Sequence, residues 1–438
     1  MKSNQKGLNF IRNQINSELP RELVKMNATD FTRKRKIGVN ELILYNLNRK
    51  GLSTKMEEYN FFKISGYENI STPGMLKQRE KLNPTIFNHL NEGLLEVYYE
   101  ECREEIKTYK GYLLTAADGS EIEIPNTKAS KDNFGRFTSG SKKTIQTPRA
   151  KVSIIVDLLN KYIMDIEIAK NRTSDYDLYK NHRKNMENKF KGYKIISIKD
   201  RGYTSLDEIH TNLKNDYKFI QRIDSKRYKK ELEEMETKDE IIYIGKGIGS
   251  SRASYYKNIN RELYDDLLRD KMIKVRAIKI PLSTGEEEIL LTNLDFSFEE
   301  MKELYNLRWG VETTYHQLKE NLKIGNISSG KSSIVRQEIL SGILVYNIVQ
   351  SFINVAEEEI EQEKYKYEMK INQNMAVGFL KDYFIFIMLE SDEKKKNKLM
   401  DEFEELIIKY LVPIRKNRRY LRDKKGHNKY HINKRKTF

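Results

Sequence analysis

The stretch from Tyr305 to Lys323 reads YNLRWGVETTYHQLKENLK, and the rest of the chain is interpreted around it. It contains four polar residues at the spacing Y-x2-R-x3-E-x6-K: Tyr305, Arg308, Glu312 and Lys319. Because each residue of an α-helix turns the chain by about 100°, these side chains fall within roughly 60° of one another, on one stripe. One acid beside two cations and a phenol suits a surface that holds a divalent metal ion and a phosphate group together.

The same stretch also fits an ordinary solvated amphipathic helix. Its apolar residues share a neighbouring stripe that would face a core: Leu304, Leu307, Val311, Leu318 and Leu322. Arg308 and Glu312 would then form an i,i+4 ion pair worth about 0.3 kcal/mol. The motif alone leaves both interpretations open, so the remaining sequence has to separate them.

Composition narrows the class of protein. The 438 residues are 38% hydrophobic and 33% charged, which is typical of a soluble chain with a substantial core. There is no apolar run of about 18 residues and no signal peptide at the N-terminus, so we expect a cytoplasmic protein with no membrane partner. The single cysteine, Cys102, excludes a disulfide framework and a cysteine-based zinc site.

The net charge of +16 favours a polyanionic partner, because each phosphate that a cation neutralises releases counterions. Basic runs occur at 31–38 and 75–82, within a helical region of residues 1–108. This region fits a helical DNA-binding domain, and it fits a helical cap with solvated lysines equally well. The basic tail at 415–436 is typical of a nucleic-acid contact or a solvated segment.

From residue 109 the pattern changes to apolar strands mixed with helices, which predicts an α/β sheet. Two acids, Asp118 and Asp200, each end a predicted strand and are followed within two residues by glycine. Sites in open α/β sheets gather beyond strand ends, so these acids can converge on one metal ion. Alternatively, each aspartate simply begins a turn. Three further strands are expected between about 204 and 289, the first and last with cationic outer faces.

Four local expectations concern loops and helices. The polar segment 127–147 is expected to be a loop, and a capping box at Ser297 is expected to open the helical region that carries Glu312. The segment from Ile334 to about Ala356 is expected to be an amphipathic helix, and 357–370 a solvated helix.

With its three acids in this order, the chain resembles the DDE transposases of bacterial insertion sequences, in the IS-four family. The first acid lies in Asp-Gly-Ser at 118–120 and the second in Asp-Arg-Gly-Tyr at 200–203. A β-rich insertion follows, and Glu312 then stands in the complete Y-R-E-K signature of that family. The resemblance covers about 110–350 well and the two ends of the chain more loosely.

The resemblance implies a ribonuclease-H-like catalytic core at 109–360, with the β-rich insertion at about 204–289. It implies that 1–108 is a helical DNA-binding domain and that 361–438 is a helical, basic region for DNA contact or dimerisation. Carried over, the metal ligands are Asp118, Asp200 and Glu312, which would hold two Mg²⁺ or Mn²⁺ ions. Tyr305, Arg308 and Lys319 would bind the DNA phosphate near the cleaved end.

Trp309, the only tryptophan, follows Arg308. It suits stacking on a base, but a core position is the interpretation we favour from the sequence. In the resembled family some members hold a flipped base with a tryptophan in the β insertion, and this insertion contains none.

The function that the resemblance implies is cut-and-paste DNA transposition, with metal-dependent cleavage at transposon ends and transfer of the 3′-OH into target DNA. The expected partners are double-stranded transposon ends, target DNA and a second copy of the chain in a synaptic complex, at the bacterial nucleoid. The alternatives are a metal-dependent nuclease without strand transfer and a DNA-binding protein with a non-catalytic core.

Overall fold

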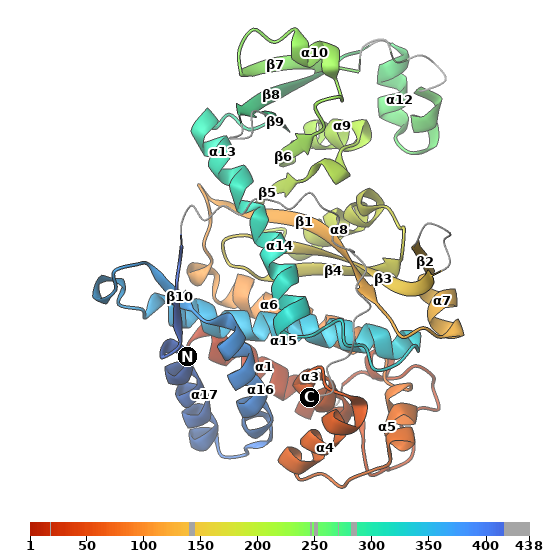
Figure 1. Ribbon diagram of the computed structural model, residues 1–438, viewed down its shortest axis with the longest axis vertical. Coiled ribbons are helices and arrows are strands. Elements are labelled where there is room, and N and C mark those ends of the chain that lie inside the picture. Colours follow the sequence, from red (N-terminus) through yellow and green to blue (C-terminus); the bar gives the residue numbers. More distant parts are fainter. Residues whose placement is uncertain are drawn as a thin grey trace.

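The computed structural model describes residues 1–17, 19–139, 145–245, 248, 253–269, 271–281 and 287–415. Most of the basic tail, from residue 416 onward, lies outside the described residues. Figure 1 shows a β-sheet that extends upward from a layer of helices, with short helices beside its upper strands. The predicted mixed α/β architecture is confirmed.

The strands of the main sheet are β1 (Tyr112–Glu123), β2 (Arg136–Ser139), β3 (Ile145–Asp157), β4 (Ile163–Lys170), β5 (Lys194–Lys199), β6 (Lys218–Ile223), β7 (Asp239–Ile244), β8 (Ile273–Pro281) and β9 (Glu287–Thr292). They form one nine-stranded sheet in the order β2-β3-β1-β5-β6-β9-β8-β7, with β4 paired to β3. β1, β5 and β6 run parallel, and the other adjacent pairs are antiparallel. The strands expected in the insertion therefore extend the same sheet.

The two faces of the sheet are covered by different helices. Met301 and Leu304 of α13 (Phe298–Leu307) share an apolar cluster with Leu114 of β1. On the opposite face, His182 of α8 (Asp175–Lys189) contacts the hydroxyl of Ser153 in β3. Because side chains alternate along a strand, every second residue of β1 from Leu114, including Asp118, lies on the α13 face.

The centre of the helical part is α15 (Ser332–Glu358), where the sequence predicted an amphipathic helix. Among the described residues, α15 is the one helix whose length and composition would allow it to cross a membrane, and 83% of its most apolar window is buried inside the protein. Burial of this extent is what a core helix shows. α15 is packed between the sheet and the outer helices.

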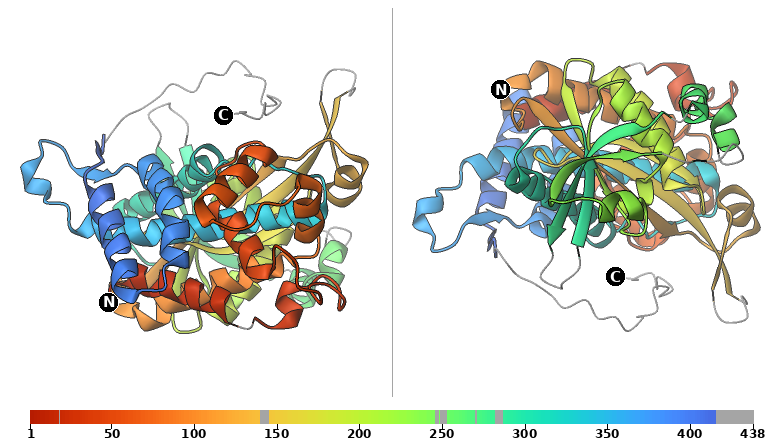
Figure 2. Two further views of the ribbon diagram at one scale, coloured as in Figure 1. Left: turned by 90° about the horizontal axis from the view of Figure 1, so that it is seen from below. Right: turned by 90° about the horizontal axis from the view of Figure 1, so that it is seen from above.

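The outer helices come from both ends of the chain. They are α1 (Ser3–Asn16), α2 (Arg21–Val24), α3 (Val39–Asn48), α4 (Thr54–Ser65), α5 (Thr72–Arg79), α6 (Thr85–Glu96), α16 (Gln373–Leu389) and α17 (Glu393–Ile408). Figure 2 shows α16 and α17 toward one end of α15 and α3 to α5 toward the other. Three shorter helices lie elsewhere: α7 (Lys128–Phe134), α9 (Leu206–Lys214) and α10 (Lys229–Glu233). One more, α12 (Arg261–Leu268), follows β7 in the insertion.

Three local expectations were wrong. The strand that we expected to end at Asp118 continues to Glu123, because β3 pairs with β1 along its whole second half. The polar segment 127–147 is not only loop, since it contains α7 and β2. The segment 357–370, expected to be a solvated helix, contains the last two residues of α15, one turn of 3₁₀-helix and the start of a short strand, β10 (Met369–Ile371), which pairs with β11 (Leu411–Pro413).

A buried ion network joins the N-terminal helices to α15. Glu338 accepts Arg79 at 2.6 Å and Arg49 at 3.0 Å, and all three side chains are almost completely buried. Burial raises the pKa of Glu338, but the charges of Arg49 and Arg79 lower it further, so its pKa lies below the ordinary value. Arg79, part of a predicted basic run, is therefore used for packing between α5 and α15.

We expect Glu338→Leu to lower the free energy of unfolding by about 3–5 kcal/mol, because two buried guanidinium groups lose their counterion. Urea denaturation followed by circular dichroism measures this change. The matched control is Glu361→Ala, which removes the exposed partner of Lys364 and should leave the midpoint unchanged. Equal midpoints for Glu338→Leu and the wild-type protein would show that the network contributes nothing.

Candidate active site

Asp118 and Asp200 lie beside each other because β1 and β5 are parallel neighbours. Ala116 of β1 pairs with Ile198 of β5, and each aspartate is two residues further along its chain. Asp200 follows β5 directly and keeps an extended backbone, with φ −80° and ψ 168°. Both side chains therefore lie on the α13 face of the sheet, next to each other and just beyond the last residues that pair β1 with β5.

Glu312 approaches this edge from α14 (Trp309–His316). A capping box at Ser297 starts α13, as predicted, and the helix is interrupted at Arg308 before α14 begins. The hydroxyl of Tyr315, about one turn after Glu312, lies 2.9 Å from the carbonyl oxygen of Asp118 and 2.8 Å from that of Val152. This contact docks α14 on β1 and β3, beside the candidate acids (Figure 1).

The pKa of Asp118 reflects its burial and the charges near it. Burial raises the pKa of Asp118 to about 6. The backbone N–H of Gly119, which donates to its carboxylate at 2.8 Å, and the charge of Arg308 lower that pKa, whereas the charges of Asp175 and Glu312 raise it. A buried carboxylate with acidic neighbours is a group whose charged form requires a nearby cation.

Arg308 is the cation that all three acids share. Its Nη2 donates to Oε1 of Glu312 at 3.0 Å, and its side chain is only 4% exposed. Burial lowers the pKa of Arg308, but Tyr305, Glu312 and Asp200 raise it to above the ordinary value. One guanidinium therefore interacts electrostatically with Asp118, Asp200 and Glu312 at once.

Asp200 has a second cation beside it. Nη1 of Arg222 in β6 lies 3.5 Å from Oδ1 of Asp200 and 3.2 Å from Oε1 of Glu288. That Oδ1 atom and the hydroxyl of Tyr305 are buried and have no hydrogen-bond partner within the described residues. Burial raises the pKa of Tyr305 to about 12, so the phenol stays protonated and can donate to a ligand.

The remaining member of the Y-R-E-K stripe, Lys319, lies further along, in the short π-helix Gln317–Asn321 that follows α14. Its Nζ donates to Oγ of Ser120 at 2.5 Å, two residues after Asp118. Burial lowers the pKa of Lys319, and the charge of Asp118 opposes that effect. The structure thus brings Tyr305, Arg308, Glu312 and Lys319 to the part of the sheet where both aspartates lie.

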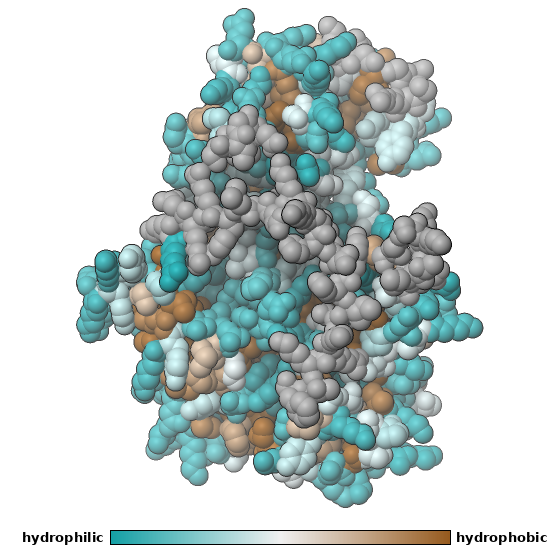
Figure 3. Space-filling model, viewed as in Figure 1, coloured by the Kyte–Doolittle hydropathy of each residue, from teal (hydrophilic) through white to brown (hydrophobic). Residues whose placement is uncertain are grey.

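Trp309 is 44% exposed, so the core position that we favoured from the sequence is wrong. The guanidinium of Arg308 lies 5.0 Å from the centre of its ring, which is within the range of a cation–π contact. Figure 3 shows mainly hydrophilic residues in the middle of the face on which α14 lies.

Sequence reasoning missed a buried network behind β1. His182 contacts Asp165 at 2.7 Å through Nδ1 and Ser153 at 3.0 Å through Nε2, and the Ser153 hydroxyl lies 3.4 Å from the carbonyl oxygen of Asp118. The histidine and serine are completely buried, so this arrangement braces β1 and β3 at Asp118 and does not meet substrate. Sequence reasoning also missed Arg222 and Glu288. The only sequence signal was the cationic face expected for β6, which points to Arg222.

Comparison with known proteins identifies the family of the chain. The profile of the family described as "Transposase DDE domain" matches residues 109–348, which is more than half of the chain. The chain belongs to this family. The match includes Asp118, Asp200 and Glu312 and excludes all the outer helices.

Among solved structures, this transposase-family chain is similar to one described as "Cryo-EM structure of piggyBac transposase synaptic complex with hairpin DNA (SNHP)". The sequence identity is 12%, the TM-score is 0.44, and the similarity covers 92% of this chain and 82% of that one. This similarity is too distant to assign residues. No curated protein matches the chain.

Because the chain belongs to a DDE family, its three candidate acids have to be compared with the requirements of a divalent metal ion. The carboxylates of Asp118, Asp200 and Glu312 are hard oxygen ligands, which Mg²⁺ and Mn²⁺ prefer. Oδ1 of Asp200, which accepts no hydrogen bond within the described residues, and the raised pKa of Asp118 both fit a nearby cation. Within the described part of the chain, however, no three acidic, histidine or cysteine side chains are grouped so that they could hold a metal ion. Glu312 is paired with Arg308 instead.

We expect Asp118→Asn to stabilise the metal-free transposase-family protein by roughly 2 kcal/mol at pH 8. The folded state holds a proton on Asp118 up to a pKa of about 6, against an ordinary value of 3.8. The wild-type protein therefore gains stability as the pH falls from above 6 toward 4, and the neutral asparagine has that gain already. Thermal unfolding in EDTA at pH 4, 6 and 8 measures the difference.

The control for net charge is Asp132→Asn on the exposed side of α7. A difference between Asp118→Asn and wild type that stays the same from pH 4 to pH 8 would contradict the assigned burial of Asp118.

Proposed function

We propose that this protein is a cut-and-paste DNA transposase of the IS-four type, which cleaves DNA at transposon ends and transfers the 3′-OH into target DNA. The observation that carries the proposal is that the β1–β5 register aligns Asp118 with Asp200, and that Arg308, whose charge acts on both aspartates, is paired with Glu312, within a chain of the DDE family. The proposed core is ribonuclease-H-like. The antiparallel strands β4, β3 and β1, followed by parallel β5 and β6, support it.

Asp118, Asp200 and Glu312 are the proposed ligands of two divalent cations, Mg²⁺ or Mn²⁺. When bound, such ions supply Lewis acidity to the attacking and leaving oxygens of a phosphodiester. The buried hydrogen-bond donors around the acids would then bind the phosphate group. Arg308 offers a planar fork to two phosphate oxygens, and Lys319 and the protonated Tyr305 add single donors.

The reaction needs no covalent protein–DNA intermediate. In cleavage, a water oxygen bonds to phosphorus and the P–O3′ bond breaks, which leaves a 3′-OH and a 5′-phosphate. In transfer, that 3′-OH attacks a target phosphodiester and displaces the target's own 3′ oxygen. The same side chains serve both steps, because both place one phosphodiester under Arg308.

We assign DNA binding to the helical region 1–108. Its basic loop Arg33–Lys36 is exposed between α2 and α3, whereas Arg79 is buried and cannot contribute. The region 361–438 is proposed to contact DNA or a second copy of the chain. The partners proposed are double-stranded transposon ends, target DNA and a homodimeric synaptic complex in the bacterial cytoplasm. Trp309 is exposed beside Arg308, which suits stacking on a base at the cleaved end.

The direct test uses a labelled duplex made from the inverted repeat that flanks the gene, with Mg²⁺ and a supercoiled target plasmid. We expect 3′-OH ends to form and to join the plasmid, and Asp118→Asn, Asp200→Asn and Glu312→Gln each to lower both products by at least about 10³-fold, the scale of losing a principal catalytic group. Cleavage without joining would favour the nuclease alternative. Binding without cleavage in the wild-type protein would favour the DNA-binding alternative.

Replacing Arg308 is expected to change metal binding and DNA cleavage in opposite directions. Without DNA its guanidinium competes with metal ions for the three acids, so Arg308→Met should raise the affinity for Mn²⁺ by about tenfold. The same variant loses its phosphate contact and should cleave transposon ends at least about 100-fold more slowly. Electron paramagnetic resonance of free Mn²⁺ and the end-cleavage assay measure the two effects.

Glu312→Gln is the matched control for that pair of measurements, because it removes a proposed ligand and leaves Arg308 in place. It should weaken Mn²⁺ binding. If Arg308→Met weakens Mn²⁺ binding as much as Glu312→Gln does, Arg308 is not the competing cation.

A further inference from the structure

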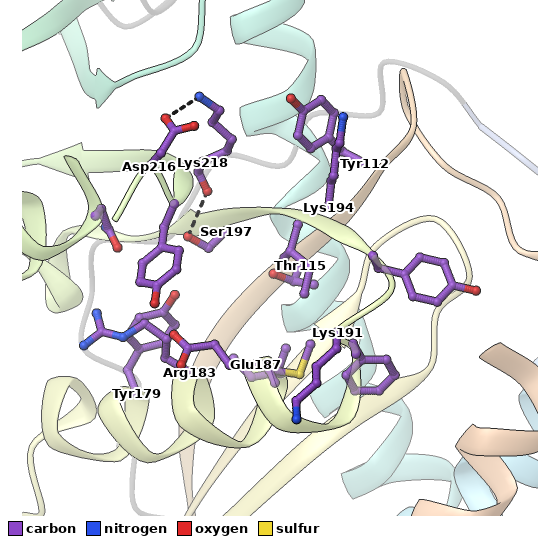
Figure 4. A pocket seen from close by; sticks show the side chains of 17 residues that line it. Tyr112, Thr115, Tyr179, Arg183, Glu187, Lys191, Lys194, Ser197, Asp216 and Lys218 are labelled. Carbon is purple, nitrogen blue, oxygen red and sulfur yellow. Dashed lines mark hydrogen bonds and ion pairs between the residues drawn. The ribbon is translucent and has the colours of Figure 1, made fainter. Parts of the chain in front are cut away.

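A second site lies on the other side of the sheet. A cavity of about 530 Å³ opens between the sheet and α8, on the face opposite the candidate active site. It is lined at the sheet by Thr115 and Ser197, which pair in register on β1 and β5. Figure 4 shows Arg183 and Glu187 of α8 on its other side, with Lys191 shortly after the end of that helix. A cavity of this size holds a small molecule.

The cavity and the acids are on opposite faces of the sheet. Tyr112, Lys194 and Lys218, which begin β1, β5 and β6, line the cavity, and Thr115 and Ser197 are its lining residues nearest to the acids. Each of these two is three positions before an aspartate, which is roughly 10 Å of strand, and its side chain is on the other face of the sheet. A ligand in the cavity is therefore separated from the reacting phosphate by the sheet.

The walls of the cavity are aromatic. Five rings line it: Tyr112, Tyr179, Phe190, Tyr193 and Tyr217. Tyr179 and Phe190 are almost completely buried, and they hold the inner wall rigid. Flat aromatic surfaces at this density favour a planar ring as the ligand, because stacking on such a ring is worth about 1–3 kcal/mol per base.

The polar groups of the cavity can read the edge of such a ring. Asn212 lines the cavity, is only 1% exposed, and its amide nitrogen has no hydrogen-bond partner in the described residues. A buried amide without a partner costs about 1–3 kcal/mol, and a ligand that accepts its hydrogen bond removes that cost. Thr115 and Ser197 add hydroxyls that can donate or accept. Their only described hydrogen bonds are long contacts of 3.4 Å to backbone carbonyls.

The rim of the cavity is positively charged. Arg183 is paired with Glu208 at 2.6 Å and Lys218 with Asp216 at 2.6 Å, so these two cations are already neutralised. Lys191 and Lys194 are exposed at the rim and form no ion pair within the described ranges. Glu187 lines the same cavity, so these two lysines leave the rim with an excess of one positive charge, which favours a ligand that carries an anionic group next to its aromatic ring.

We propose that this cavity binds a nucleoside 5′-monophosphate group, with the base stacked between the aromatic walls and the phosphate at Lys191 and Lys194. The amide of Asn212 and the hydroxyls of Thr115 and Ser197 contact the edge of the base. The group comes either from a free nucleotide or from the 5′-phosphorylated end of a single DNA strand. Because the sheet separates the site from the three acids, it does not depend on the transposase reaction.

The test is isothermal titration calorimetry of the full chain in EDTA with each deoxynucleoside 5′-monophosphate, with the matching nucleosides and with inorganic phosphate. Nucleotides are expected to bind at least tenfold more tightly than either fragment. The double variant Lys191→Glu/Lys194→Glu should weaken nucleotide binding at least tenfold, and Ser197→Leu, which fills the cavity, should abolish it. Lys184→Glu is the matched control, because it lies on the exposed side of α8 outside the cavity and should change nothing.

A 5′-phosphorylated single-stranded trinucleotide distinguishes the two sources. Binding more than tenfold tighter than the mononucleotide, lost again in the double lysine variant, assigns the site to a DNA strand end. Equal or weaker binding assigns it to a free nucleotide. The proposal is overturned if no nucleotide or trinucleotide binds, if inorganic phosphate binds as tightly as the nucleotides, or if folded Ser197→Leu and the double lysine variant both bind like the wild-type protein.

Discussion

The parallel pairing of β1 with β5 is the constraint on which the rest of the site depends. It places two aspartates that are 82 positions apart in the chain next to each other on one face of the sheet. A slip of one residue would turn one of them to the α8 face, since side chains alternate along a strand. The antiparallel pairing of β1 with β3 prevents such a slip, because it continues past Asp118 to Glu123.

The third acid, Glu312, is positioned by an uncharged side chain of the same helix, that of Tyr315. The Tyr315 hydroxyl lies between two backbone carbonyls of the sheet, one of them that of Asp118 itself, and this contact fixes α14 across the strands. The charges of these acids are offset by cations of the protein itself: Arg308 pairs with Glu312, and Arg222 lies beside Asp200. Under the proposed function, metal ions would replace Arg308 as the partner of Glu312.

The sequence predicted those parts that depend on local chemistry. The strand that ends at Asp200, the capping box at Ser297 and the long helix α15 follow from apolar patterning and from residues that cap helices, and the structure contains all three. What the sequence could not predict depends on partners distant in the chain. Asp118-Gly119 resembles a turn until β3 pairs with it, and Arg79 resembles a DNA contact until Glu338 of α15 accepts it. Trp309 looked like a core residue because tryptophan is usually packed, and only the position of α14 exposes it.

The account is tested most directly by locating manganese in crystals of the protein bound to a transposon-end duplex, using anomalous scattering. The central claim predicts density for manganese coordinated by Asp118, Asp200 and Glu312 together, with the Arg308 guanidinium turned from Glu312 to the DNA phosphate. Manganese bound elsewhere, or Glu312 still paired with Arg308 in the DNA complex, would contradict it.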